Sequence, residues 1–196
     1  MKNYYLIHAF KEKKMLRKVV LGLSGFVAMF ALSTTSLLAT EYAHEFSDKK
    51  MSLAWSVNGD TLAVKVSAPT EGWVGVGFNP TDKMKDANFI LGYVKKGKAK
   101  IIDEFGTDKT KHSSDKKLGG TVDAVLVSGV EEGGVTTIEF TMPLNSSDKN
   151  DTKIDVNGDT IVLLAYGAGR DSFKSKHKYR ATFKVNLSTG TAEKAK

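Results

Sequence analysis

Cysteine is absent from this sequence of 196 residues. Its absence excludes disulfide bonds, thiolate zinc and iron–sulfur sites, cysteine nucleophiles and the covalent attachment of c-type haem. Any metal in this protein must therefore be bound through nitrogen, oxygen or thioether atoms.

The motifs of the common enzyme classes are also absent. There is no Gly-x-Ser-x-Gly elbow, no His-Glu-x-x-His zinc helix and no Walker loop. Acidic pairs and runs at 103–104, 131–132 and 148–155 fall in turns or at strand ends, where we expect solvated surface charge. The paired carboxylates of a glycosidase have no sequence signature, and we do not favour them here. We predict that the protein is not an enzyme.

Concentrated positive charge is lacking outside the N-terminus. The formal net charge is +7, but residues 1–39 carry six Lys and Arg against one Glu, so the rest of the chain is nearly neutral. Nucleic-acid binders concentrate basic residues on one surface. We therefore exclude a nucleic-acid partner.

Residues 1–39 have the pattern of a secretory signal peptide. Basic residues at 11–18 precede an apolar run over 19–32 and a Leu-Leu-Ala sequence that ends at Ala39. The apolar run is short for a membrane span, so we predict export with cleavage near Ala39, to the periplasm or the extracellular space. An uncleaved segment that anchors the protein to a membrane is the alternative.

Apolar residues in the exported part recur at every second position, as they do in strands that bury one face. The strand candidates, each bounded by Gly, Asn, Asp or Lys-rich turns, are 51–57, 62–66, 73–78, 87–95, 98–105, 121–128, 135–142, 161–166 and 179–187. We predict an all-β fold, an antiparallel immunoglobulin-like β-sandwich of about nine strands over 48–188. A linker at 40–47 and a flexible tail at 189–196 would flank it, and the polar segment 106–120 would be a surface loop.

The most specific feature is a glycine-rich run, Glu71-Gly72-Trp73-Val74-Gly75-Val76-Gly77-Phe78-Asn79-Pro80. Glycines at alternate positions remove side chains from one face of a strand, so something flat or another sheet can approach closely. Met84 follows, and then Asp86-Ala87-Asn88 before an apolar strand with Gly92-Tyr93. Taken alone, the glycines are better explained by tight sheet packing, and Met84 by an ordinary exposed methionine in a Lys-rich turn.

This run resembles the DOMON domain family, β-sandwiches of extracytoplasmic proteins. The resemblance continues at Leu163-Leu164-Ala165-Tyr166-Gly167, at His177 and Arg180, and in the strand 181–187. One branch of the family, which includes the cytochrome domain of cellobiose dehydrogenase, binds haem b non-covalently and transfers electrons. Other branches are thought to bind sugars or to serve as interaction modules.

The haem branch implies two axial iron ligands, a methionine after the Gly-Trp strand and a histidine before the last strand. Here these would be Met84 and His177, and a six-coordinate iron of this kind favours electron transfer over oxygen chemistry. Arg180 or Arg170 would bind the haem propionates. The expected apolar walls are Trp73, Val76, Phe78, Phe89, Tyr93, Tyr166 and Phe173.

Several alternatives remain open. Some haem proteins of related fold use a lysine at this place, so Lys174 or Lys176 is an alternative to His177, and His112 is a weaker competitor. The predicted function is a b-type cytochrome that exchanges single electrons with an extracytoplasmic or membrane-bound redox protein. The alternatives are a carbohydrate-binding or interaction module without haem, and an accessory subunit of a larger oxidoreductase.

Overall fold

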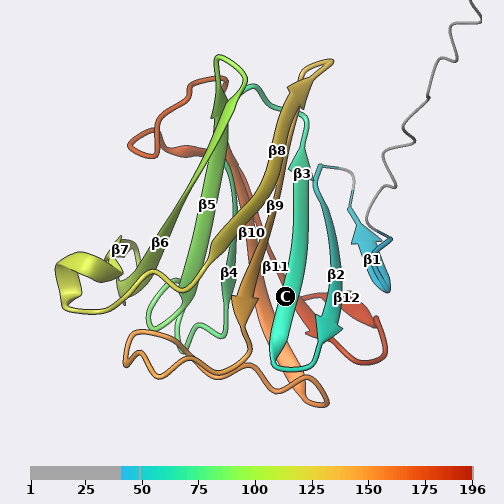
Figure 1. Cartoon of the computed structure of the whole chain (residues 1–196), viewed down its shortest axis with the longest axis vertical. Coiled ribbons are helices and arrows are strands. Elements are labelled where there is room, and N and C mark those ends of the chain that lie inside the picture. The colour runs from blue at the N-terminus through green and yellow to red at the C-terminus, as the bar shows by residue number, and fades with distance from the viewer. Residues whose placement is uncertain (1–40, 49, 196) are drawn as a thin grey trace, which may run out of the picture. The chain divides into compact units, whose positions relative to one another are not determined.

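The computed structural model describes residues 41–48 and 50–195, and the predicted signal peptide lies outside them. The described residues form two antiparallel sheets that pack face to face (Figure 1). This confirms the predicted β-sandwich. Within the same residues, no helix is long and apolar enough to cross a membrane.

The first sheet has five strands in the order β1-β2-β3-β9-β8. A tight turn with Gly59 at positive φ joins β2 to β3, as the Asn58-Gly59-Asp60 sequence predicts. The strand bounds are β1 (His44–Ser47), β2 (Ser52–Asn58), β3 (Thr61–Ala68), β8 (Val125–Glu132) and β9 (Val135–Pro143).

The second sheet has seven strands in the order β12-β11-β10-β4-β5-β6-β7. The glycine-rich run is β4, and it lies in the middle of this sheet between β10 and β5. The strand bounds are β4 (Val74–Phe78), β5 (Asn88–Lys95), β6 (Lys98–Asp108), β7 (Lys111–Ser114), β10 (Asp159–Gly167), β11 (His177–Asn186) and β12 (Ala192–Lys194).

All nine predicted strands are present, although β8 begins four residues later than expected and continues to Glu132. The structure adds three short strands, β1, β7 and β12. Two of them correct the expected linker and tail, because β1 pairs with β2 and β12 pairs with β11. Backbone pairing orders these short ends, and Phe46 of β1 also packs against the main core.

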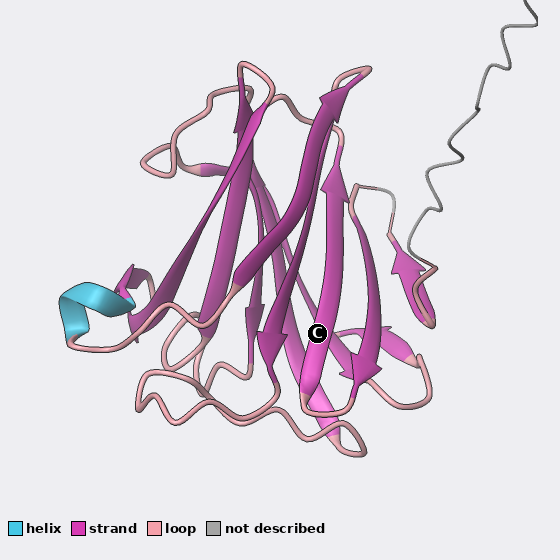
Figure 2. Cartoon of the chain, viewed as in Figure 1, coloured by secondary structure: helices cyan, strands magenta, loops and turns pink. Residues whose placement is uncertain are grey.

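The expected loop at 106–120 is also a correction, since β6 extends into it and β7 pairs back onto β6. The segment then forms a 3₁₀ turn, η1 (Asp115–Leu118), the one helical piece of the part of the chain that Figure 2 colours by structure.

The main core fills the space between the two sheets. Its largest fully buried side chains include Trp55, Phe78 and Phe140. The indole Nε1 of Trp55 donates a hydrogen bond of 2.9 Å to the carbonyl oxygen of Leu187, which ties the two sheets together. Each such side chain contributes roughly 2–3 kcal/mol through burial.

Candidate functional site

The seven-stranded sheet is apolar on both faces. In β4, Val74, Val76 and Phe78 point into the main core, so the alternate residues Trp73, Gly75 and Gly77 belong to the outer face. A second apolar cluster lies there, which we call the outer cluster. Its members are Trp73, Ala87, Phe89 and Leu91, with Met84, Tyr93, Ile102, Leu163, Ala165 and Phe173 packed against them at its margin.

The chain's own side chains lie over the glycines of β4. A Cβ placed at Gly77 would overlap the ring of Phe89, and one at Gly75 would lie 3.0 Å from Cγ of Leu91. The indole of Trp73 lies over Gly167, and its Nε1 donates to the carbonyl oxygen of Ser175 at 3.1 Å. The glycines are thus required for close packing of large side chains on the outer face.

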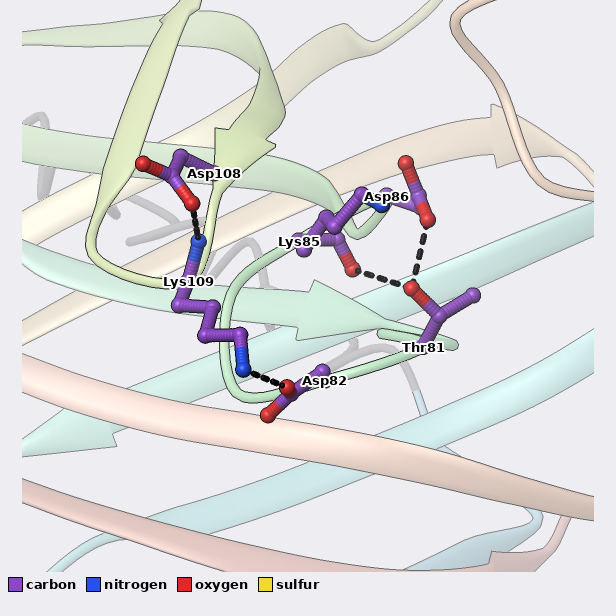
Figure 3. A network of polar contacts seen from close by, with 6 residues as sticks. All are labelled: Thr81, Asp82, Lys85, Asp86, Asp108 and Lys109. Atoms are coloured by element: carbon purple, nitrogen blue, oxygen red, sulfur yellow. Dashed lines mark hydrogen bonds and ion pairs between the residues drawn. The ribbon is translucent and has the colours of Figure 1, made fainter.

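Met84 lies in the loop between β4 and β5, and this loop is fixed by several contacts. The amide of Met84 donates to the carbonyl oxygen of Lys109 at 3.3 Å, and the amide of Asp86 donates to that of Gly106 at 2.8 Å. Figure 3 shows Lys109 reaching down to Asp82, with a separation of 2.7 Å between Nζ and Oδ2. The loop is therefore docked on the turn between β6 and β7.

The backbone of the Met84 loop is strained. Asn79, Lys83 and Asp86 have φ of 51°, 58° and 61°, in the left-handed region, which Asn and Asp adopt more readily than Lys does. Strain of this kind costs on the order of 1 kcal/mol per residue or more, and it is concentrated at functional sites. Gly106 is required beside the loop, because a Cβ there would overlap the backbone carbonyl of Met84.

His177 is exposed and begins β11, where it pairs with Gly167. Gly167 also lies beside the start of β4, because its amide donates a hydrogen bond of 2.8 Å to the carbonyl oxygen of Trp73. His177 is therefore level with the start of β4, whereas Met84 follows the end of β4. The two residues lie at opposite ends of that strand, about 16 Å apart along it at 3.3 Å per residue. The structure therefore does not bring Met84 and His177 together, and Phe89 and Leu91 pack over Gly77 and Gly75 between them.

The predicted apolar walls divide between the two faces of the sheet. Trp73, Phe89, Tyr93 and Phe173 lie in the outer cluster, where the rings of Tyr93 and Phe173 are 4.5 Å apart. The remaining three, Val76, Phe78 and Tyr166, are buried in the main core and correct the sequence-based set.

Arg180 lies beside the outer cluster. It pairs with Ala165 across β11 and β10, and its side chain is exposed.

The competing ligands differ in their surroundings. Lys174 and Lys176 are exposed in the loop before β11. His112 is half-buried on β7, its Nδ1 contacts Oε2 of Glu104, and its ring lies 5.6 Å from that of Phe89. Since His112 pairs with Gly106, it lies on the same side of the sheet as the Met84 loop.

A group of buried acids next to β5, on the face of the sheet that is turned toward the main core, was not predicted from the sequence. Asp103 and Asp115 are 3% and 1% exposed, and Asp151 is half-buried. Each offers one carboxylate oxygen to a group in which all three oxygens lie within 4.8 Å of one another. We call these residues the acidic cluster. The expectation of solvated surface charge at Asp103 is wrong, because Asp103 shares the inward face of β6 with Ile101.

The acidic cluster holds its protons more tightly than free carboxyls do. Burial raises the pKa of Asp103 to about 6. Burial, together with the charge of Asp103, raises the pKa of Asp115 to about 7. Burial and the hydrogen bond to Asp123 raise the pKa of Asp151 to about 7. The neighbouring Asp148 has a lowered pKa because the amides of Asn150 and Thr121 donate to it.

Together these features define a β-sandwich with an apolar outer face, a methionine loop beyond one end of β4 and an exposed histidine level with the other end. The DOMON domain family matches residues 47–167, which is more than half of the chain. The protein belongs to the DOMON family.

Two relatives carry the same name. The chain is 34% identical over 144 residues to human "DBH-like monooxygenase protein 1", which covers 72% of this chain and 23% of the human protein. It is 31% identical over 114 residues to the mouse protein of that name, covering 58% of this chain and 18% of the relative. The chain thus spans about a quarter or less of these relatives.

Two solved structures share the fold. The cytochrome b domain of pyranose dehydrogenase from Coprinopsis cinerea superposes with a TM-score of 0.57 at 14% identity, covering 71% of this chain and 78% of that domain. The cytochrome domain of cellobiose dehydrogenase from Myriococcum thermophilum gives 0.55 at 10% identity, covering 75% and 81%. At these identities the comparison establishes the fold alone.

Replacing Gly106 with Ala tests whether the Met84 loop depends on its docking site. The new methyl group would overlap the backbone of Met84, so we expect a loss of about 1–3 kcal/mol in the free energy of unfolding, measured by urea titration. Gly169→Ala is the matched control, because the nearest atom to a Cβ there is 3.8 Å away. Equal stability of the two variants would contradict this account of the loop.

The acidic cluster predicts an unusual pH dependence of stability. Because Asp103, Asp115 and Asp151 bind protons in the folded protein at a pH where the unfolded chain is ionised, the free energy of unfolding falls as the pH rises from about 5 to about 8. In buffer with a chelator, we expect the melting temperature at pH 8 to be at least about 3 °C lower than at pH 5.5. Asp115→Asn should flatten this slope, whereas Asp60→Asn, in an exposed turn, should not. A melting temperature that rises between pH 5.5 and 8 would refute the assignment.

Proposed function

We propose that this chain is an exported, haem-binding DOMON domain that passes single electrons between extracytoplasmic redox partners. One observation carries the proposal. The apolar outer face of the glycine-bearing strand β4 has the docked Met84 loop beyond one end and His177 level with the other. The basic, apolar pattern of residues 1–39 supports export to the periplasm or the extracellular space.

The types of donor atom suit haem b, but a haem above Gly75 and Gly77 requires Phe89 and Leu91 to move aside. A thioether and an imidazole are established ligands of haem iron; Met84 packs against the outer cluster, and His177 begins β11 beside Gly167. Haem, when bound, would supply one-electron exchange, and Met84 and His177 would hold its iron.

The residues around the outer face would keep water away from such a group. Trp73, Phe89 and Leu91 are each at most 9% exposed, and Tyr93 and Phe173 cover the margin at the far end of β5. Apolar surroundings of this kind would raise the reduction potential of haem iron, because they disfavour the oxidised form, which carries one more positive charge. The exposed guanidinium of Arg180 would pair with a haem propionate, and the basic loop with Lys174 and Lys176 would attract an acidic redox partner.

A haem-free interaction module is the second candidate, and one observation favours it. Phe89 and Leu91 occupy the space above Gly77 and Gly75, so the outer face is packed by the chain's own side chains. A sugar-binding platform has less support, because both tryptophans, Trp55 and Trp73, are buried. The monooxygenase names of the curated relatives belong to proteins of which this chain spans 23% or less, so substrate turnover is not part of the proposal.

Haemin titration of the full chain, followed by visible absorption, tests the assignment of the ligands. We expect Met84→Ala and His177→Ala each to change the absorption bands and to weaken haemin binding about tenfold or more, since each removes one iron ligand.

Matched controls come from the same regions. Lys85→Ala, in the Met84 loop, and His112→Ala should bind haemin as the unaltered protein does. If His112→Ala weakens binding and His177→Ala does not, His112 is the ligand and the assignment of His177 is wrong. Unchanged spectra in both Met84→Ala and His177→Ala would refute the pair.

A further inference from the structure

The acidic cluster brings together three segments that are distant in sequence. Asp103 comes from β6, Asp115 from the first residue of η1, and Asp151 from the long connection between β9 and β10. They meet at one end of the sandwich, near Asn88 at the start of β5. None of the functions discussed above uses these residues.

Several buried polar atoms at this place have no hydrogen-bond partner among the described residues. They are Oδ1 of Asp103, Oδ1 of Asp115 and Oδ1 of Asn88, and each belongs to a side chain that is at most 3% exposed. The amide nitrogen of Asn88 donates to Oδ1 of Asp151 at 2.6 Å, so Asn88 borders the cluster directly. Buried oxygens without partners are rare, because each costs on the order of 1–3 kcal/mol or more.

No positive charge of the described chain neutralises these acids. The ion pairs among the described residues join Lys109 to Asp82, His112 to Glu104 and Lys184 to Asp159, all outside the cluster. Oδ2 of Asp103 accepts hydrogen bonds from the amides of Asp123 and Ala124, at 3.0 and 3.3 Å. These bonds fix the carboxylate and leave Oδ1 available to bind a cation. Buried acidic side chains that have no basic side chain beside them are commonly bound to metal ions.

We propose that Asp103, Asp115 and Asp151 bind one Ca²⁺ ion, with the amide oxygen of Asn88 as a fourth ligand. Two oxygens on opposite sides of one Ca²⁺ lie about 5 Å apart, given Ca–O distances of about 2.4 Å. The three carboxylate oxygens, all within 4.8 Å of one another, match that size.

The type of ligand selects this class of cation. All the available atoms are oxygens, which suit hard cations, whereas zinc prefers the histidine and cysteine ligands that the cluster lacks. Ca²⁺ accepts six to eight oxygens in flexible geometry, while Mg²⁺ requires a near-ideal octahedron at about 2.1 Å. A cluster assembled from a strand, a 3₁₀ turn and a loop favours the more adaptable cation.

A bound cation would link two connections to β6. One is the β7–β8 connection that contains η1, and the other is the segment 144–158 between β9 and β10. The segment 144–158 reaches the Met84 loop through Thr152, whose hydroxyl donates to the carbonyl oxygen of Asp86 at 2.9 Å. Ion binding would therefore stabilise the end of the sandwich that holds Met84, whether or not haem binds.

Thermal unfolding and calorimetric titration of the full chain with CaCl₂ test the proposal. We expect one Ca²⁺ per chain, and a melting temperature at saturating Ca²⁺ about 5 °C or more above that in a chelator, at constant ionic strength. MgCl₂ should give a clearly smaller shift.

Asp115→Asn separates metal binding from simple loss of structure. Because it removes one of three repelling charges, the variant should melt at a higher temperature than the unaltered protein in chelator, yet it should lose the response to Ca²⁺. Asp60→Asn, an exposed acid, should keep the full response.

Three results would overturn the proposal. They are no calorimetric binding and no melting shift of the unaltered chain at millimolar Ca²⁺, an equal response to Mg²⁺ and Ca²⁺, or a full response of Asp115→Asn. If Asp115→Asn does not fold, the titration of the unaltered chain and the same test on Asp151→Asn decide the question.

Discussion

The arrangement of this protein depends on one constraint in β4, the absence of side chains at alternate positions of a central strand. Gly75 and Gly77 allow Phe89 and Leu91 of the neighbouring strand to lie flat against the sheet, while Val74, Val76 and Phe78 fill the core behind it. A sheet that is apolar on both faces must be covered on both. The five-stranded sheet covers one face, and the outer cluster, with Phe173 folded over its margin, covers the other.

The proposed electron-transfer site and the acidic cluster occupy the two sides of β5. Phe89 points to the outer face, and the preceding Asn88 points inward to Asp151. The Met84 loop joins the two, since Asp86 contacts Gly106 on one side and Thr152 on the other. The strained φ values of this loop are maintained because both neighbours restrain it. Loss of either neighbour would therefore affect Met84 without any change in the outer face itself.

The sequence predicted much of the fold, because alternation of apolar residues is clear in strands such as β2 and β3. It missed β1, β7 and β12, which are too short to show an alternating pattern and are held largely by backbone pairing. The site was predicted less well. The alternation that separates Trp73 from Phe78 was available in the sequence, but both were assigned to one wall. The burial of Asp103 could have been read from its register with Ile101, whereas the approach of Asp115 and Asp151 depends on loops that have no periodic signal.

The central proposal, that the outer face of this DOMON domain holds a haem, is tested most directly by the visible spectrum of the native protein. The spectrum should be recorded as purified and again after reduction with dithionite. The account predicts a coloured protein whose bands sharpen on reduction, as expected for six-coordinate, low-spin iron. A colourless protein that also fails to bind added haemin would contradict the account and favour the haem-free interaction module.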